Sequence, residues 1–178
     1  MTAPLHADPE YANRVLKVNH AGENGAVNIY RGQIFAAQLT ARSMLVELSE
    51  FKAHEERHRS LFWSELLRRG RPRCKSYLLC GWGGFMLGVV TGLLGRRAIA
   101  ATTVAVESVV LHHLEQQLEM LRDTDAAAYH AVAAIVSEEK HHHDQSASHI
   151  KAGQFLPRLI TPVVAGSTEV VIWLGMRL

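Results

Sequence analysis

The chain has 178 residues, of which 48% are hydrophobic and 20% are charged, and its formal net charge is +2. This length and composition predict one folded domain, residues 1–178, with a sizeable core, and they exclude a disordered chain. The small net charge gives no support to nucleic-acid binding, so we expect no nucleic-acid partner.

The first segments of the chain predict a polar start followed by two helices. The N-terminal stretch MTAPLHADPEYANR carries acidic residues and no apolar run, so we expect neither a signal peptide nor a typical transit peptide. Residues 9–40 and 43–69 then show apolar side chains at steps of three and four, the spacing of a helix with one buried face. The stretch RRGRPR is expected to end the second of these helices.

The next segment, residues 77–95, contains no charged residue. The two cysteines at its start, Cys74 and Cys80, lack the spacing of a zinc motif, and the scarcity of cysteine suits a reducing compartment. Glycines at every fourth position, Gly84, Gly88 and Gly92, predict one smooth helix face for close packing. We expect this helix to lie in or on a membrane interface, with a transmembrane span and an ordinary buried helix as alternatives.

The second half of the chain predicts two further bundle helices and another apolar helix. Residues 97–122 and 125–150 repeat the helical apolar spacing, and the stretch RDTD between them offers Asp123, Thr124 or Asp125 as a cap. Residues 156–178 are apolar with little polar relief. The predicted fold is therefore all-α, a ferritin-like four-helix bundle of two hairpins, about 9–69 and 97–150, with two additional apolar, membrane-associating helices.

Glutamates interrupt the apolar stripe of every predicted bundle helix. An isolated buried carboxylate is very unfavourable, so these positions need a compensating charge. Two of the glutamates have a histidine three residues later, which places both side chains on one helix face. The set matches the inward ligands of a di-iron or di-manganese bundle. The predicted metal ligands are Glu23, Glu55, His58, Glu107, Glu139 and His142.

The spacing of these residues selects the register within the stretch SEEKHHHDQ, which contains three consecutive histidines. Glu107, Glu139 and His142 each lie 84 residues after Glu23, Glu55 and His58. The same offset pairs Glu138 with His54, so Glu138 is not expected to be a ligand. The repeat also predicts two hairpins related by a pseudo-twofold axis.

Several residues near the predicted ligands are expected to have supporting roles or none at the metal site. His54, His141 and His143 are expected to lie off the stripe, where they are solvated or hydrogen-bonded. Asp144 and His113 are candidates for supporting a ligand or a proton path, and His20 is a weak ligand candidate. Gly22 and Gly25 flank Glu23 and are expected to leave room beside the metals for dioxygen or substrate. These expectations depend on which side of each helix faces the bundle centre.

Four stretches, VNHAGENGAVNIYRGQ, HEERH, TVAVESVVLHH and EEKHHHD, resemble the demethoxyubiquinone hydroxylase family of ubiquinone biosynthesis. The resemblance covers about residues 11–178. It implies a ferritin-like di-iron monooxygenase on one leaflet of a membrane, which hydroxylates the benzoquinone ring of a polyprenylated precursor. Ser108 and Leu114 depart from residues often found in that family, and Leu114 weakens any aromatic role in electron transfer at that position.

The resemblance also implies the cofactors, partners and location. It assigns Glu23, Glu55 and His58 to one iron and Glu107, Glu139 and His142 to the other, with Glu55 and Glu139 as the bridges. Two Fe ions, Fe²⁺ in the reduced form, would use O₂ as co-substrate and NADH as reductant. The implied partners are a polyprenyl quinone, a membrane surface, other ubiquinone-biosynthesis proteins and further copies of the chain. We expect a peripheral protein on the cytoplasmic face of a bacterial inner membrane.

Three other functions remain open from the sequence. A quinol oxidase or peroxidase could use the same metal site without changing the quinone ring. An iron-storage protein could use the same bundle, although the charge-free segment 77–95 argues against a polar cage-forming surface. A lipid-binding partner protein could retain the metals for structural reasons alone.

Overall fold

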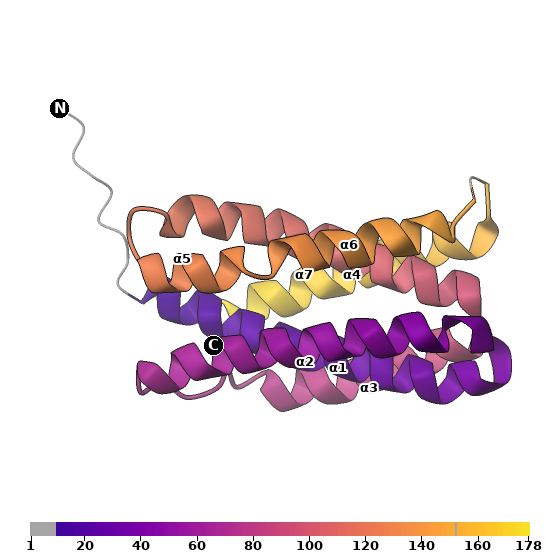
Figure 1. Ribbon diagram of the computed structural model, residues 1–178, viewed down its shortest axis with the longest axis horizontal. Helices are drawn as coiled ribbons and strands as arrows, with labels where there is room; N and C mark the ends of the chain where they lie inside the picture. The colour runs from indigo at the N-terminus through magenta and orange to yellow at the C-terminus, as the bar shows by residue number, and fades with distance from the viewer. Residues whose placement is uncertain (1–9, 152) are drawn as a thin grey trace.

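The computed structural model describes residues 10–151 and 153–178, so most of the N-terminal stretch expected to lack a targeting signal lies outside the described residues. Within these ranges the ordered elements are helices and none is a strand, which confirms the predicted all-α class (Figure 1). The elements are α1 (Tyr11–Thr40), the 3₁₀ turn η1 (Arg42–Met44), α2 (Leu45–Arg68), α3 (Tyr77–Leu93), α4 (Arg96–Leu121), α5 (Ala126–Ala133), α6 (Val136–Ser148) and α7 (Phe155–Gly175).

The bundle consists of α1, α2, α4 and the pair α5–α6, as the ferritin-like prediction requires (Figure 1). Apolar side chains fill it in two clusters. One cluster, around Leu16, Phe62 and Leu114, lies where α1 begins, and the other, around Tyr30 and Phe51, lies near the η1 turn. Both clusters are almost completely shielded from water. The glutamates of the apolar stripes lie between the two clusters, in the middle of the bundle.

The predicted helix 125–150 is wrong in one respect, because the structure divides it into α5 and α6. Asp125 caps α5 by accepting a hydrogen bond from the backbone N–H of Ala128 at 3.0 Å, as the RDTD stretch predicts. The helix is then interrupted at Ala134 and Ile135, and Ile135 is buried in the first apolar cluster. The interruption lies one turn before Glu139, so α6 is a separate short helix that carries Glu139 and His142.

The helix α3 lies against α1 on the glycine face that its sequence predicts. A methyl group at Gly84 would lie 2.3 Å from the carbonyl oxygen of Gly25, and one at Gly88 would lie 2.1 Å from that of Ile29. Only glycine permits this approach. The expectation that Gly25 leaves room beside the metals is therefore wrong, since Gly25 faces α3. Gly22 is exposed, with no atom of another element within 4 Å of its added methyl position.

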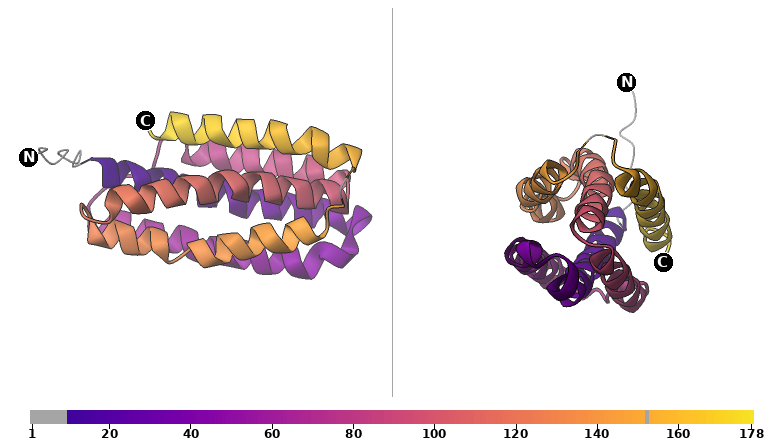
Figure 2. Two further views of the ribbon diagram at one scale, coloured as in Figure 1. Left: turned by 90° about the horizontal axis from the view of Figure 1, so that it is seen from above. Right: turned by 90° about the vertical axis from the view of Figure 1, so that its right-hand side faces the viewer.

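The internal repeat extends to the two apolar helices. In the first half α3 follows α2 and packs on α1, and in the second half α7 follows α6 and packs on α4. The end view shows α3 and α7 on the same side of the bundle, with α2 and α6 on the opposite side (Figure 2). Each half is thus a unit of three packed elements, in which the apolar helix covers the first helix of its own hairpin.

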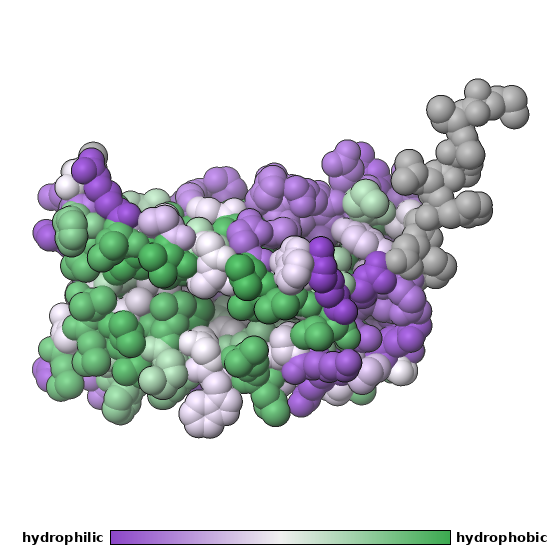
Figure 3. All heavy atoms as spheres, turned by 180° about the vertical axis from the view of Figure 1, so that it is seen from behind, coloured by the Kyte–Doolittle hydropathy of each residue, from purple (hydrophilic) through white to green (hydrophobic). Residues whose placement is uncertain are grey.

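The face formed by α3 and α7 is strongly apolar (Figure 3). Its exposed large hydrophobic side chains are Leu78, Leu79, Trp82, Met86, Val90 and Leu93 on α3, and Phe155, Leu159, Val163, Val170, Val171, Trp173 and Leu174 on α7. Within the described residues, α7 is the helix whose length and composition would suffice to cross a membrane, and most of its side chains are exposed or half-buried. The 17-residue α3, where a span was one alternative, is shorter.

Candidate metal centre

The six residues predicted as metal ligands meet at the centre of the bundle, and all six are buried. They form two overlapping groups, in each of which the candidate ligand atoms lie within 4.8 Å of one another. One group contains Glu23, Glu55, His58 and Glu139, and the other contains Glu55, Glu107, Glu139 and His142. Glu55 and Glu139 belong to both groups, which is the arrangement expected of carboxylates that lie between two cations.

Both histidines direct the same ring nitrogen inward. The Nδ1 atom of His58 lies 3.0 Å from Glu139 Oε1 and 3.6 Å from Glu55 Oε2. The Nδ1 atom of His142 lies 3.2 Å from Glu55 Oε1 and 3.4 Å from Glu139 Oε2. Each imidazole therefore contacts both shared carboxylates. In each Glu-x-x-His pair the spacing of three residues places the histidine and the glutamate on the same helix face. The two pairs therefore offer the same ligand types in the same arrangement.

Burial and the charge of neighbouring carboxylates raise the pKa of two of the four glutamates. Burial raises the pKa of Glu23 well above its ordinary value, and the charge of Glu55 raises it further. Burial and the charge of Glu139 raise the pKa of Glu107 in the same way. Burial would lower the pKa of His142, but its contacts with Glu139 and Glu55 raise that pKa to about 9. The cluster therefore favours added positive charge, which divalent cations supply more effectively than protons.

The donor atoms fit a pair of divalent cations. Both Glu55 oxygens, Glu139 Oε2, His58 Nδ1 and His142 Nδ1 are buried without a hydrogen-bond partner. Buried polar atoms are rarely left without a partner, and such exceptions require an explanation. Four carboxylates and two imidazoles in two overlapping groups provide the oxygen and nitrogen ligands that suit Fe(II) or Mn(II).

The outward nitrogens of the two histidines have partners that the sequence prediction missed. His58 Nε2 lies 2.7 Å from Glu138 Oε2, and His142 Nε2 lies 3.0 Å from His54 Nδ1. Such partners fix the tautomer and orientation of a ligand histidine. The signal was present in the sequence, because Glu138 and His54 occupy equivalent positions in the repeat. His54 was expected to be solvated or hydrogen-bonded, and the hydrogen-bonded alternative is correct.

The other candidate residues contact groups away from the centre. Asp144 pairs with Lys140 and His143 on its own helix, and His113 pairs with Glu169 of α7 at 2.8 Å, so neither supports a ligand histidine. His141 is exposed. His20 is buried between the Trp63 and Tyr77 rings, and burial together with Arg73 lowers its pKa to about 4. The candidate histidine ligands are therefore the two that belong to the Glu-x-x-His pairs, His58 and His142.

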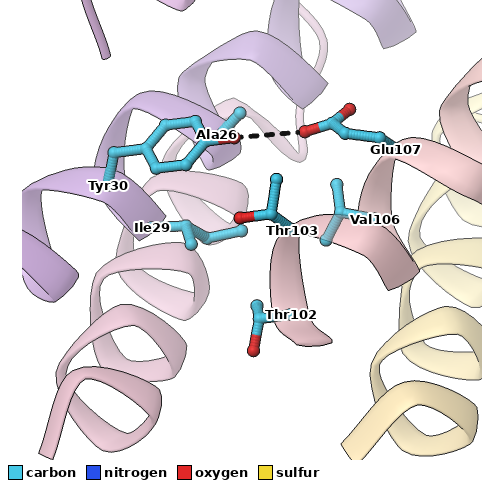
Figure 4. Close-up of a pocket in the computed structure, with 7 residues that line it drawn as sticks. All are labelled: Ala26, Ile29, Tyr30, Thr102, Thr103, Val106 and Glu107. Atoms are coloured by element: carbon cyan, nitrogen blue, oxygen red, sulfur yellow. Dashed lines mark hydrogen bonds between the residues drawn. The ribbon is translucent and has the colours of Figure 1, made fainter. Parts of the chain in front are cut away.

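A small cavity lies between α1 and α4 beside Glu107 (Figure 4). Its volume is about 10 Å³, and the residues that line it are Ala26, Ile29, Tyr30, Thr102, Thr103, Val106 and Glu107. Tyr30 donates a hydrogen bond from its hydroxyl to Glu107 Oε1 at 3.3 Å (Figure 4). An apolar cluster that includes Ile29, Leu87, Val106 and Val164 lies beside the cavity and extends to α3 and α7. The apolar face is thereby connected to the candidate ligand Glu107.

Comparison with known proteins finds relatives over most of the chain. A protein of Xylella fastidiosa named 3-demethoxyubiquinol 3-hydroxylase is 32% identical over 96% of this chain and 77% of its own length. A Rhodospirillum rubrum protein with the same name is 40% identical over 68% of this chain and 58% of its own length. In Dictyostelium discoideum, a protein named NADPH-dependent 3-demethoxyubiquinone 3-hydroxylase, mitochondrial, is 39% identical over 62% of this chain and 50% of its own length.

Apart from the Xylella protein, the chain spans only about half the length of these curated relatives. The family described as "Ubiquinone biosynthesis protein COQ7" matches residues 10–175, a range that contains all six candidate ligands and both apolar helices. With this match and the relatives named above, the chain belongs to the COQ7 family of ubiquinone biosynthesis proteins.

Proposed function

We propose that the chain is a di-iron monooxygenase that uses O₂ to hydroxylate the benzoquinone ring of a polyprenylated demethoxyubiquinone precursor. The observation that carries the proposal is the pair of overlapping ligand groups at the bundle centre, joined by Glu55 and Glu139. The names of the Xylella and Rhodospirillum relatives supply the substrate and the position of hydroxylation.

In this proposal each half of the chain supplies the same three ligands. Glu23, Glu55 and His58 hold one iron, the equivalent residues Glu107, Glu139 and His142 hold the other, and Glu55 and Glu139 bridge them. A pair of bound iron ions supplies the reductive activation of O₂ needed to transfer one oxygen atom to a ring carbon. The protein holds the ligands rigidly between two apolar clusters, which keeps bulk water from the centre.

The cavity beside Glu107 offers the quinone ring a route to the centre. Ala26, Ile29 and Val106 give it an apolar wall, and Tyr30 holds Glu107 from the opposite side. The polyprenyl tail would lie along the apolar cluster that joins Val106 to Leu87 and Val164. The cavity is smaller than a quinone ring, so entry of the ring requires α1 and α4 to separate slightly at this point.

The apolar face of α3 and α7 supports attachment to one leaflet of a membrane (Figure 3). We place the chain on the cytoplasmic face of a bacterial inner membrane, with α3 and α7 in the interface. Such a face also favours association with further copies of the chain or with other ubiquinone-biosynthesis proteins. For the reductant we propose a nicotinamide; the family resemblance implies NADH, whereas the Dictyostelium relative is named NADPH-dependent.

The decisive experiment is hydroxylation of demethoxyubiquinol by the purified chain loaded with Fe(II), under ¹⁸O₂, with NADH or NADPH supplied separately. The expected product carries one ¹⁸O atom on the ring. The Glu139→Ala variant should lose this product because both metal positions share its carboxylate. Replacing Glu115, an exposed glutamate of α4, by Ala is the matched control.

Other outcomes identify the alternative functions. Consumption of O₂ and reductant with an unchanged ring would indicate a quinol oxidase. Binding of many more than two iron ions per chain would indicate storage. Full ring hydroxylation by Glu139→Ala would contradict the assignment of the centre and would leave the metals a structural role.

A further inference from the structure

The two candidate ligand histidines are supported by unlike partners in a crossed arrangement. Glu138 comes directly before Glu139, yet its Oε2 contacts His58 of the other hairpin at 2.7 Å. His54 comes directly before Glu55, yet its Nδ1 contacts His142 of the other hairpin at 3.0 Å. Each helix therefore contributes one ligand pair and one support for the opposite histidine.

The repeat makes these supports equivalent in position but not in chemistry. An offset of 84 residues relates His54 to Glu138, as it relates the ligands themselves. Glu138 is a carboxylate, and Arg57 holds its other oxygen at 2.9 Å. His54 is an imidazole whose ring centre lies 5.2 Å from that of His142, with the ring planes inclined by 23°. One ligand histidine thus faces a carboxylate and the other faces a second imidazole.

This difference in partner at Nε2 changes how strongly Nδ1, on the other side of each ring, can bind a metal. When Nδ1 of a histidine binds a metal, Nε2 carries the proton and donates it to the supporting group. A carboxylate acceptor pulls on that proton strongly and makes the imidazole a better ligand, whereas an imidazole nitrogen is a weaker acceptor. His58 should therefore bind a cation more tightly than His142, although both motifs have the same sequence spacing.

We infer that His54 and Glu138 are positioning residues that make the two metal positions unequal, with the tighter position at Glu23 and His58. The weaker position, at Glu107 and His142, is the one beside the cavity. This inference rests on the proposed metal centre and extends it. Glu138 Oε2 also lies 4.0 Å from His54 Nδ1, beyond hydrogen-bond distance, so its short contact is with His58 alone.

Substitutions at position 54 can exchange the acceptor with little change of shape. The Oδ1 atom of Asp or Asn follows Cγ as Nδ1 does in histidine, and the three residues have similar helix propensity. His54→Asp therefore places a carboxylate against His142, and His54→Asn places a neutral carbonyl oxygen there. His141→Asp adds the same charge beside His142 on an exposed position and is the matched control.

The test is titration of the full-length, metal-free chain with Co(II), followed by calorimetry and visible absorption. The unaltered chain should bind two Co(II) ions with affinities that differ by about tenfold or more. His54→Asp should raise the weaker affinity by about tenfold, whereas His54→Asn and His141→Asp should leave it within about threefold. Glu138→Gln should lower the tighter affinity by about 10- to 100-fold.

A spectroscopic readout separates a positioning role from a general effect on folding. In the Co(II)-loaded chain each ligand histidine should give one shifted, solvent-exchangeable ring N–H signal in the proton NMR spectrum. Both variants of His54 should move one of these signals, and Glu138→Gln should move the other. His141→Asp should move neither signal.

The outcomes distinguish the inference from the proposed function. Two Co(II) ions bound with equal affinity, or a titration unaffected by His54→Asp, would overturn the inference and leave the metal centre in place. Failure of the unaltered chain to bind Co(II) would overturn both. If His54→Asp does not fold, as judged by circular dichroism, the signals of His54→Asn and Glu138→Gln decide the question.

Discussion

In the proposed function, single side chains determine how closely the quinone can approach the centre. Glu107 is the candidate ligand that lines the cavity; Ala26 lies across from it on α1, and Thr103 lies on α4 one turn before it (Figure 4). The space beside them is no larger than about one water molecule. In the proposed function, small side chains at these positions would control access to the metals without contributing ligands.

The Ala26→Leu substitution should block this access. The larger side chain fills the cavity, so hydroxylation of the quinone should fall by about tenfold or more, since small displacements of a substrate have large effects on rate. Two metal ions per chain should still bind, because the Ala26 side chain offers no ligand atom. Ala133→Leu, at an exposed position of α5, is the control. Unchanged turnover by Ala26→Leu, with the metal content intact, would show that the quinone takes another route.

At the level of helices, close packing and capping set the relative positions of the elements. Backbone contact between α3 and α1 depends on glycines that leave no space for a side chain. The junction between α2 and α5 depends on Arg69, whose two terminal nitrogens contact the Asp125 oxygens at 2.7 and 2.8 Å. The same carboxylate caps α5, so one residue fixes both the start of α5 and its distance from α2.

Replacing Gly88 by Ala should separate α3 from α1. The added methyl group would lie 2.1 Å from the Ile29 carbonyl oxygen, and relief of that clash should lower the free energy of unfolding by about 2 kcal/mol or more. Gly83→Ala lies on the same helix with no atom of another element within 4 Å, and it should instead stabilise the helix by up to about 1 kcal/mol. Chemical denaturation measures both changes, and equal effects would contradict the close packing.

Replacing Asp125 by Ala should destabilise the chain by about 1 kcal/mol through loss of the cap, with a further loss from the Arg69 pair. Asp125→Asn retains the cap acceptor and should be milder. Hydrogen bonding to Arg69 lowers the pKa of Asp125, so its stabilisation is present above the ordinary carboxyl pKa and disappears as pH falls through the lowered value. In thermal unfolding from neutral to acid pH, the difference between the unaltered chain and the Asp125→Asn variant should shrink at low pH.

For the whole molecule, the two sides of the bundle differ in character. The side with α3 and α7 is apolar, whereas α2 and α6 lie on the opposite side and carry His54, Glu138 and Arg57 near the surface (Figure 2). The cavity beside Glu107 belongs to the apolar side. In the proposed function a lipid-soluble substrate enters from that side, while the supports of the ligand histidines remain near water.

Charged substitutions on the apolar face should release the chain from membranes. The double variant Leu79→Glu with Val163→Glu places one carboxylate on α3 and one on α7, at side chains that are 69% and 66% exposed. Its sedimentation with phosphatidylethanolamine–phosphatidylglycerol vesicles should fall by about tenfold or more, because carboxylates strongly disfavour the interface. Val46→Glu, on α2 at an 81% exposed position, should bind vesicles normally. Equal binding by all three chains would contradict the assigned membrane face.

Some features of the fold and of the candidate site can be predicted from the sequence, and others cannot. The meeting of Glu55 and Glu139 in the core was predictable. Carboxylates rarely occupy an apolar helix stripe, so they mark a special site, and the 84-residue repeat shows which glutamate of each helix faces that site. The break at Ala134 and Ile135 was not, since the stretch AVAAIV contains no residue that interrupts a helix on its own. The supports His54 and Glu138 lie at the edge of the stripe, where small rotations of α2 and α6 decide which atoms meet.

The packing of α3 was predictable only in part. Its glycine spacing indicates a close helix contact, but nothing in the segment says which helix it meets, and Gly25 was accordingly assigned to the metals. Which helix α3 packs against depends on the surface shapes of both helices, and the sequence of α3 alone does not give the shape of the other. The ligand roles themselves stay predictions until metal is measured in the chain.

The internal repeat has a consequence for the symmetry of the candidate metal centre. The halves are joined only by Leu94 and Gly95, and Gly95 has a φ of 86°, which turns the chain directly from α3 into α4. A separate copy of the first half would present one glutamate, one Glu-x-x-His motif and one apolar helix. Two such copies, related by an exact twofold axis, would already form a complete centre. The two halves are therefore equivalent in every candidate ligand, and they differ in the supports of the two histidines, which are Glu138 for His58 and His54 for His142.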